Sequence, residues 1–437
     1  MPFHNAELFP LSANINIAGN LEIGGCDTVS MAQEFGTPLY VYDESTIRSM
    51  AKTYLHEFSS RYPDTTVAYA SKAFLNKEMS RIANEEGLSL DVVSGGEIAV
   101  AVSTGFPAER MYFHGNNKTL QELSEAINVG IGTIVVDGFQ ELDLLNEIAK
   151  GKGMVQGIML RLSPSVDAHT HGHTTTGILD VKFGFSIESG EGTVAIRQAL
   201  GSSNLDLKGI HFHLGSPIFE LEPYSEAIDT VLEYLVQFKD AGLNLREFSP
   251  GGGFAIGYVR NELPPKISQY AEIITSMLKI KCKDLGYTEP KLIIEPGRSI
   301  VGRAGVALYT VGVIKEIPTV RTYVSLDGGM GDNIRPALYG SKYEAVAANK
   351  MFESGKEKIV TLAGKYCESG DLLVKDVPLP VLEPGDIVAI PSSGAYCLAM
   401  SSNYNMNPRP AVVMVENGKT RLIRRRETYE DLMALDI

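Results

Sequence analysis

The sequence is poor in cysteine. It contains only four cysteines, at positions 26, 282, 367 and 397, and no two of them form a C-x-x-C pair. Cysteines that are this widely spaced are typical of free thiols in a reducing compartment, and they argue against a disulfide framework or a cysteine zinc site. We therefore expect a cytoplasmic protein without a structural metal.

Long apolar runs and an excess of positive charge are also absent. No segment approaches the ~18 consecutive apolar residues of a membrane helix, and Met1–Pro10 lacks the basic and apolar regions of a secretory signal. The formal net charge of −14 disfavours nucleic acid and anionic membranes as partners. The 44% share of hydrophobic residues is that of a globular enzyme, and 437 residues predict two domains.

Strand-like and helix-like segments alternate through the middle of the chain. Short apolar runs are separated by segments with apolar residues three and four apart, such as Leu120–Asn128 and Tyr224–Ala241. The strand-like runs are Val67–Lys72, Ser89–Val93, Met111–His114, Gly132–Asp137, Gly157–Leu162, Gly209–Leu214, Leu245–Ser249 and Leu292–Glu295. Eight such units predict a closed (β/α)8 barrel of the TIM type, with parallel strands and right-handed crossovers. A doubly wound open sheet is the structural alternative.

The pattern changes after about residue 304, where strand-like runs follow one another with few helices between them. They are Val306–Ile314, Thr322–Leu326, Lys358–Ala363, Asp386–Ile390 and Ala411–Val415. Asn417 and Gly418 stand between two such runs and predict a two-residue hairpin turn. We therefore expect an α/β plus β architecture. The barrel would span residues 43–304, and a second, mainly antiparallel β domain would comprise residues 1–42 and 305–437.

Lys72 ends the first strand-like run of the barrel. An ammonium group is costly to bury, and a lysine there can shift toward the neutral amine that forms a Schiff base with an aldehyde. A lysine that simply extends past the strand end into solvent is the alternative interpretation. The other strands also end in polar residues, as expected for a barrel with its chemistry at the carboxyl ends of the strands. These residues are Asp91, His114, Asp137, Arg161, His213 and Glu295.

Two glycine-bearing loops follow the seventh and eighth strands. Gly251, Gly252 and Gly253 would let backbone N–H groups approach an anion closely, and Glu295-Pro296-Gly297-Arg298 forms the second loop. Loops at these two positions are the usual phosphate site of TIM-type barrels. A tight turn without a ligand is the alternative for the glycines. A dinucleotide fingerprint does not fit, because Ile256 stands where its third glycine is required.

Several motifs together carry a resemblance to a known family. Tyr69–Lys72, His211–Ser216, the triple glycine and Glu295–Arg298 resemble the pyridoxal-phosphate decarboxylases of the alanine-racemase-like barrel fold. That group includes diaminopimelate, ornithine and arginine decarboxylases. Three further stretches are similar to the diaminopimelate decarboxylases in particular; they are Asp327–Tyr339, Cys367–Asp371 and Gly394–Tyr396. The resemblance implies a pyridoxal 5'-phosphate enzyme that converts meso-2,6-diaminopimelate to L-lysine and CO2, the last step of lysine biosynthesis. It also implies a cytoplasmic homodimer with shared active sites.

The resemblance further implies a role for each matching residue. Lys72 would form a Schiff base with the cofactor aldehyde, and Cys367 of the partner subunit would donate a proton. Glu295 would keep the pyridine nitrogen protonated, which argues against a racemase, where an arginine takes that place. The other cofactor-binding residues would be Asp91, Arg161, His213, Ser216, Gly251, Gly252, Gly253, Pro296, Gly297, Arg298 and Tyr396. The substrate-binding residues would be Arg298, Arg335, Tyr339, Glu368 and Tyr396.

Two functional alternatives stay open at this point. One is a decarboxylase of the same fold that acts on ornithine, lysine or arginine, although in those enzymes an aspartate follows the cysteine, where Glu368 stands here. The other is a non-catalytic barrel that retains the cofactor. His169, His171 and His173 alternate and could suggest a metal site, but no carboxylate–histidine frame accompanies them. We expect a loop over the site there, and no metal.

Overall fold

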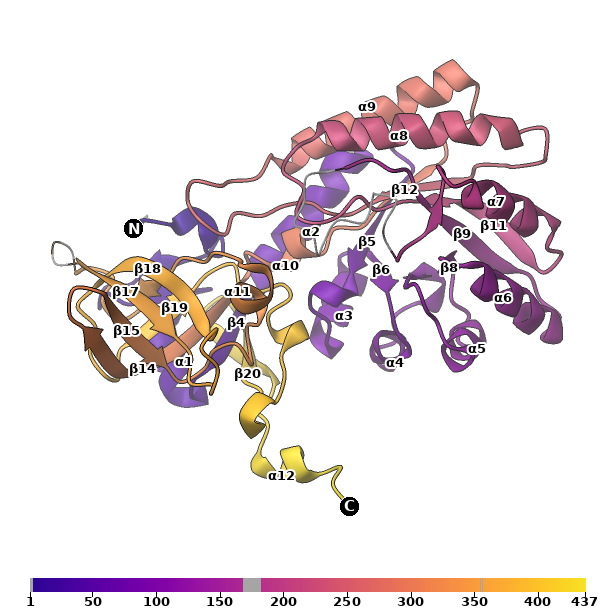
Figure 1. Ribbon diagram of the computed structural model, residues 1–437. Helices are drawn as coiled ribbons and strands as arrows, with labels where there is room; N and C mark the ends of the chain where they lie inside the picture. The colour runs from indigo at the N-terminus through magenta and orange to yellow at the C-terminus, as the bar shows by residue number, and fades with distance from the viewer. Residues whose placement is uncertain (1–2, 168–181, 354, 356) are drawn as a thin grey trace. The chain divides into compact units, whose positions relative to one another are not determined.

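The computed structural model describes residues 3–167, 182–353, 355 and 357–437. The chain divides into two compact units (Figure 1). The first, here called the β unit, comprises Met1–Met50, Ile256–Pro264 and Arg298–Ile437, and the second, the barrel unit, comprises Ala51–Ala255 and Pro265–Gly297. These bounds differ from the predicted limits at residues 43 and 304. The difference arises because flanking segments bond within the β unit: Asp43 N donates to Ala304 O, and Ser392 Oγ donates to Gly257 O.

Eight parallel strands form a closed ring in the barrel unit. They are β5 (Thr65–Ala70), β6 (Ser89–Val92), β7 (Met111–Phe113), β8 (Thr133–Val136), β9 (Gln156–Ser163), β11 (Leu205–His211), β12 (Glu247–Gly251) and β13 (Lys291–Ile294). Neighbours pair in this order, and β13 pairs in parallel with β5 to close the ring. The (β/α)8 prediction is therefore confirmed, and the open sheet is excluded. A short strand, β10 (Phe185–Ser186), pairs with the end of β9.

Helices follow the strands, as a barrel of this type requires. They are α3 (Lys77–Glu85), α4 (Gly95–Ser103), α5 (Leu120–Asn128), α6 (Phe139–Gly151), α7 (Glu191–Gly201), α8 (Glu222–Leu235) and α9 (Ile267–Leu285), and α2 (Glu44–Ser59) precedes the first strand. Side chains cap several of them directly after the strand ends. Asn76 Oδ1 accepts a hydrogen bond from Met79 N, and Ser94 Oγ accepts one from Glu97 N.

The barrel interior is filled by side chains from several strands. Ala68, Tyr112, Val135, Met159 and Ile293 form one buried cluster. Because successive side chains of a strand point to opposite faces, these residues occupy the inside of the ring while their neighbours pack against the helices. The centre of the barrel is therefore packed, and the polar residues at its strand ends stand above a solid floor.

The β unit is built on a nine-stranded sheet. Its strands are β4 (Leu39–Asp43), β14 (Gly305–Ile317), β15 (Arg321–Leu326), β16 (Val346–Ala347), β17 (Glu357–Ala363), β18 (Leu372–Pro380), β19 (Ile387–Ile390), β20 (Ala411–Glu416) and β21 (Lys419–Arg424). Two pairs, β4 with β20 and β15 with β17, are parallel, and the other pairs are antiparallel. The predicted mainly antiparallel domain is thus confirmed. The turn between β20 and β21 has positive φ at Asn417 (51°) and Gly418 (75°), as the hairpin prediction requires.

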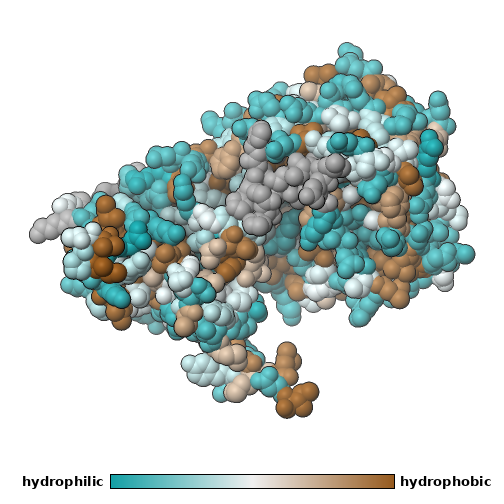
Figure 2. All heavy atoms as spheres, viewed as in Figure 1, coloured by the Kyte–Doolittle hydropathy of each residue, from teal (hydrophilic) through white to brown (hydrophobic). Residues whose placement is uncertain are grey.

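The remaining elements of the β unit are short. A separate three-stranded sheet consists of β1 (Asn14–Ile15), β2 (Leu21–Ile23) and β3 (Cys26–Asp27), and the helices are α1 (Thr28–Phe35), α10 (Arg298–Val301), α11 (Arg335–Tyr339) and α12 (Tyr429–Met433). On the face shown in Figure 2, polar side chains predominate and apolar ones form separate patches. Within the described ranges, no helix has both the length and the apolar character that crossing a bilayer requires.

Candidate active site

Glu295 lies at the centre of a buried polar network in the barrel unit. It directly follows β13, and its Oε1 accepts a hydrogen bond from Ser249 Oγ of β12 at 2.8 Å. Its Oε2 lies 3.2 Å from Nε2 of His211, the last residue of β11. Burial opposes ionisation of Glu295, but its electrostatic interactions with the His211 and His114 rings and the hydrogen bonds from His211 and Ser249 hold its pKa below the ordinary value. Glu295 is therefore a carboxylate at neutral pH.

Asp91 and His114 extend this network. His114 follows β7, and its Nε2 lies 3.6 Å from Glu295 Oε1 and 3.8 Å from Oδ1 of Asp91, which belongs to β6. Burial lowers the pKa of His114 well below its ordinary value, so the ring is neutral, and burial raises the pKa of Asp91 to about 8. Asp91 Oδ1 and His114 Nε2 have no hydrogen-bond partner among the described residues. Buried polar atoms without a hydrogen-bond partner suggest a place where a ligand binds.

Arg161 of β9 brings a cation to the same end of the barrel. It is buried, its Nη1 lies 3.8 Å from Asp137 Oδ2, and its guanidinium lies 4.4 Å from the centroid of the Phe183 ring. Asp137 Oδ1 in turn accepts a hydrogen bond from Gly184 N at 2.8 Å. The segment that begins at Lys182 is thereby tied to the strand ends.

The triple glycine permits close packing of backbone after β12. A Cβ on Gly252 would lie 2.1 Å from Glu295 O, and one on Gly253 would lie 2.5 Å from Gly215 O. Gly251 and Gly253 also have φ values of 76° and 102°, which favour glycine. The loop after β13 packs as closely, since Ala70 N donates to Pro296 O and a Cβ on Gly297 would lie 2.8 Å from Ala70 Cβ. Both loops therefore need glycine for close packing of the backbone, and their approach to an anion stays a prediction.

His213 is anchored to the triple glycine. Its Nδ1 accepts a hydrogen bond from Gly252 N at 3.2 Å, and the ring is partly buried. Burial, together with the charges of Lys72 and Arg161, lowers the pKa of His213 well below its ordinary value. The ring is therefore neutral with its proton on Nε2. Ser216, three residues further along, is also partly buried.

Lys72 lies in a 3-10 turn, Ser71–Ala73, that directly follows β5. The turn itself is buried at Ser71 and Ala73, but Lys72 is exposed in this chain. The argument that burial drives this lysine toward the neutral amine is therefore wrong. Its charge nevertheless reaches the network, since it lowers the pKa of Asp91 against the larger effect of burial. Lys72 thus contributes a positive charge beside Asp91 from an exposed position.

The predicted arginines belong to the β unit, where tyrosines surround them. Arg298, which begins α10, donates from Nη1 to Tyr258 OH at 2.6 Å, and its guanidinium lies 4.7 Å from the Tyr396 ring centroid. Arg335, which begins α11, is buried and donates from Nη1 to Tyr343 OH. No carboxylate is paired with Arg335 anywhere in the described part of the chain. Among its described residues, the unit thus holds a buried cation without a carboxylate counter-ion.

The other predicted substrate residues differ in exposure. Tyr339, at the end of α11, is partly buried, whereas Cys367 and Glu368 are both exposed. Cys367 is fixed by its backbone, because its N–H donates to Asn405 Oδ1 at 2.9 Å. The histidines at 169, 171 and 173 lie outside the described residues.

Sequence reasoning assigned no role to several residues of these two groups. Ser249 and His114 end predicted strands, and this position was the only sign in the sequence that they belong to the site. Tyr258 and Tyr343 gave none, since both depend on contacts between distant segments. Cys397, which also has no role assigned from the sequence, is buried with its Sγ 3.6 Å from Tyr343 OH.

The barrel residues fit the pyridoxal phosphate that the sequence resemblance implies. An amine, a carboxylate, a neutral imidazole and a close-packed glycine loop meet at one end of the barrel, and unsatisfied buried atoms remain beside them. His114, His211 and Glu295 bring ligand atoms within 4.8 Å of one another, which would also suit a metal ion. The adjoining glycine loop and lysine favour an organic phosphate instead.

Known proteins resemble this chain over nearly its whole length. Residues 45–302 match the family described as pyridoxal-dependent decarboxylase, pyridoxal binding domain. The chain is 49% identical to the diaminopimelate decarboxylase of Bacillus subtilis (strain 168), over 97% of this chain and 96% of that protein. Identity to the diaminopimelate decarboxylase of Synechocystis sp. is 45%, over 100% and 94% of the two chains. The crystal structure of diaminopimelate decarboxylase from M. jannaschii in complex with L-lysine matches with a TM-score of 0.92 and 36% identity, covering 98% of each chain. The chain therefore belongs to the diaminopimelate decarboxylases, a family of pyridoxal-dependent decarboxylases.

Proposed function

We propose that this protein removes CO2 from meso-2,6-diaminopimelate to give L-lysine, with pyridoxal 5'-phosphate as cofactor. The observation that carries the choice of substrate is the buried Arg335 guanidinium, which has no carboxylate partner among the described residues. A buried charge without a counter-ion is costly, so the site is suited to an anionic ligand. Arginine can bind a carboxylate through two parallel hydrogen bonds. Diaminopimelate carries a second carboxylate at its far end, whereas ornithine, lysine and arginine carry only a cation there.

The barrel residues would provide the chemistry of bond cleavage. The bound cofactor supplies an electron sink for the electron pair left behind when CO2 departs. Lys72 would hold the cofactor covalently, and Glu295, as a carboxylate, would keep a proton on the pyridine nitrogen. His211 and Ser249 fix the direction of Glu295 through their hydrogen bonds. Neutral His213, held by Gly252 N–H, would lie against the ring.

Other residues would contact the edges of the ring and the phosphate of the same cofactor. Asp91 and Arg161 would support the ring, and Ser216, the triple glycine, Pro296, Gly297, Arg298 and Tyr396 would hold the phosphate. Glycine loops suit a phosphate because no side chain blocks its approach, although Gly251 N and Gly252 N already donate to Ser249 Oγ and His213 Nδ1. Arg298, Arg335, Tyr339, Glu368 and Tyr396 would bind the substrate, and their mixed charges suit a far end with both a carboxylate and an ammonium.

We further propose a homodimer in which Cys367 and Glu368 act in the active site of the second copy. Cys367 would deliver the proton that takes the place of CO2 on the α-carbon. The exposure of both residues supports this, because a proton donor must be covered when it acts, and a second copy could cover it. Exposed apolar residues at the C-terminal end, Met433, Leu435 and Ile437, give further support for a surface that pairs. Four free cysteines support a reducing cytoplasm as its location.

The test is release of CO2 by the purified protein, supplied with pyridoxal phosphate, from diaminopimelate, ornithine, lysine and arginine. We expect release from meso-diaminopimelate, and faster release from any of the other three would overturn the substrate. Arg335→Gln should lower kcat/KM for diaminopimelate by roughly two orders of magnitude, since it removes one partner of a buried charge pair. Arg321→Gln is the matched control, because Arg321 is a partly exposed arginine paired with Asp376. It should leave kcat/KM unchanged.

A further inference from the structure

Tyr258 contacts both arginines that the proposed function assigns to the substrate. Its hydroxyl accepts the 2.6 Å hydrogen bond from Arg298 Nη1, and the face of its ring lies 4.6 Å from the Arg335 guanidinium. A cation over an aromatic ring is attracted by the negative face of the ring, more strongly where water is excluded. One side chain therefore restrains two guanidinium groups in two different ways.

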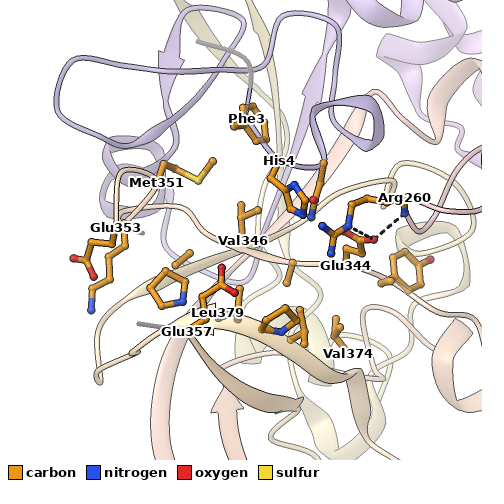
Figure 3. A pocket seen from close by; sticks show the side chains of 18 of the residues that line it. Phe3, His4, Arg260, Glu344, Val346, Met351, Glu353, Glu357, Val374 and Leu379 are labelled. Atoms are coloured by element: carbon orange, nitrogen blue, oxygen red, sulfur yellow. Dashed lines mark hydrogen bonds and ion pairs between the residues drawn. The ribbon is translucent and has the colours of Figure 1, made fainter. Parts of the chain in front are cut away.

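The segment that carries Tyr258, residues 256–264, is itself fixed within the β unit. Arg260 donates to Glu344 Oε1 from its backbone N at 2.8 Å and from Nε at 3.2 Å, as Figure 3 shows. On the other side of Tyr258, Gly257 O accepts a hydrogen bond from Ser392 Oγ at 2.8 Å. Tyr258 thus stands between two anchored neighbours and has little freedom to move along the segment.

Tyr343 completes the arrangement around Arg335. Its hydroxyl accepts a hydrogen bond from Arg335 Nη1, and its ring meets that of Tyr258 edge to face, with centroids 5.2 Å apart. Tyr343 directly precedes Glu344, the partner of Arg260. The two tyrosines that contact Arg335 are therefore both adjacent to the same ion pair.

We propose that Tyr258 is a positioning residue, which sets the separation and orientation of Arg298 and Arg335 for the carboxylates of the substrate. This inference rests on the proposed function and deepens it. A phenol oxygen and a ring face restrain a guanidinium without neutralising it, whereas an acidic partner would compete with the substrate carboxylate. Arg335 consequently keeps its full charge for the ligand, while the geometry of both guanidinium groups is already fixed.

The experiment compares kcat and KM of Tyr258→Phe and Tyr258→Leu for meso-diaminopimelate. Tyr258→Phe keeps the ring beneath Arg335 but removes the acceptor for Arg298, and we expect KM to rise about tenfold, as for loss of a hydrogen bond to a charged group. Tyr258→Leu also removes the ring, and KM should rise about a further tenfold. We expect kcat to change by less than about threefold, because the groups that cleave the bond are untouched. The visible absorbance of bound cofactor should stay as in the wild type.

Two further variants separate positioning from loss of folding. Tyr323→Leu is the matched control, since Tyr323 also faces an arginine, Arg321 at 5.9 Å, and it should leave KM unchanged. Glu344→Gln weakens the anchor of the segment without touching either substrate arginine, and it should raise KM in the same direction. The inference is overturned if KM of Tyr258→Leu equals that of the wild type. It is also overturned if kcat, KM and cofactor absorbance of Tyr258→Phe all deteriorate together. A wild type that releases no CO2 from diaminopimelate would instead defeat the proposed function itself.

Discussion

The pKa values of buried carboxyl groups in this protein shift in opposite directions, and the immediate neighbours of each group decide the direction. Glu295 has two histidines beside it and accepts a hydrogen bond from Ser249, and its pKa is held below the ordinary value. Asp332, which lies three residues before Arg335, accepts hydrogen bonds from Gly329 N and Tyr309 OH, both at 2.7 Å. These two bonds do not offset its burial, and its pKa rises to about 7. The hydrogen bonds from Gly329 N and Tyr309 OH therefore do not keep the pKa of Asp332 low against burial, whereas the two imidazole rings and the Ser249 hydroxyl keep that of Glu295 low.

The raised pKa of Asp332 predicts a specific dependence of stability on pH. Because the unfolded carboxyl has its ordinary pKa of about 4, the folded state binds more protons between about pH 4 and about 7. Stability from this group is therefore present below that range and lost as pH rises through it, by at most about 1.4 kcal/mol for each pH unit. Asp332→Asn should flatten the curve of unfolding free energy against pH in this range, measured by urea unfolding. The exposed Asp376→Asn should retain the wild-type curve, and an equally steep curve in Asp332→Asn would contradict the assignment.

At the scale of elements, glycines rather than side-chain contacts determine the backbone path of the loop after β12. A Cβ at position 252 would lie 2.1 Å from Glu295 O, a backbone atom that cannot move without displacing β13. Gly252→Ala should therefore lower affinity for pyridoxal phosphate by about tenfold or more, because a shift of about 1 Å in a binding group is costly. Titration of the apoprotein with cofactor, followed by absorbance, measures this. Gly138→Ala, at a glycine after β8 with no atom within 4 Å of its Cβ, should bind as the wild type does. Equal affinity of the two variants would refute the steric argument.

The sequence predicts most reliably those helices and strands that a short, continuous pattern of apolar residues defines. The strands of the barrel can be predicted because each is a short apolar run. Strand β11 begins at Leu205, four residues before the predicted start at Gly209, because the polar Asp206 and Lys208 interrupt the apolar pattern of its first residues. Strand β18 was not predicted, since Pro378 and Pro380 argue against a strand, yet it lies at the edge of its sheet, where proline is tolerated.

The same distinction applies to the site. Lys72 and Glu295 could be singled out because a strand end is visible in the sequence. Tyr258 and Tyr343 could not, because their positions depend on the pairing of Arg260 with Glu344, which stand 84 residues apart. Contacts between residues so far apart in the sequence form only when the chain folds, and no local sequence pattern predicts them. The exposure of Lys72 was missed for a related reason: the sequence shows that a strand ends there, but not what covers its end.

For the whole molecule, the two units carry different parts of the proposed reaction. The barrel unit holds most groups assigned to the cofactor, from Lys72 to Gly297. The β unit holds Arg298 and Tyr396, together with Arg335, Cys367 and Glu368. If the β unit of one copy completes the barrel of the other, the loss of Lys72 in one chain and of Cys367 in the other spares one complete site in a mixed dimer. The proposed sharing can therefore be tested by complementation between two defective chains.

We expect a mixed dimer of Lys72→Ala and Cys367→Ala, co-expressed and isolated through two different affinity tags, to regain about half of the wild-type activity per dimer. Each parent homodimer should be nearly inactive, because every site lacks either the lysine or the proton donor. In the mixed dimer one site combines both defects, and the other combines an intact Lys72 with an intact Cys367. The matched control pairs Lys72→Ala with Glu295→Gln. Both of these changes lie in the barrel unit, so each site of that dimer retains one defect and no activity should return. No recovery in the first pair would show that each chain builds its site alone. Recovery in the control would contradict the assignment of Lys72 and Glu295 to the same site.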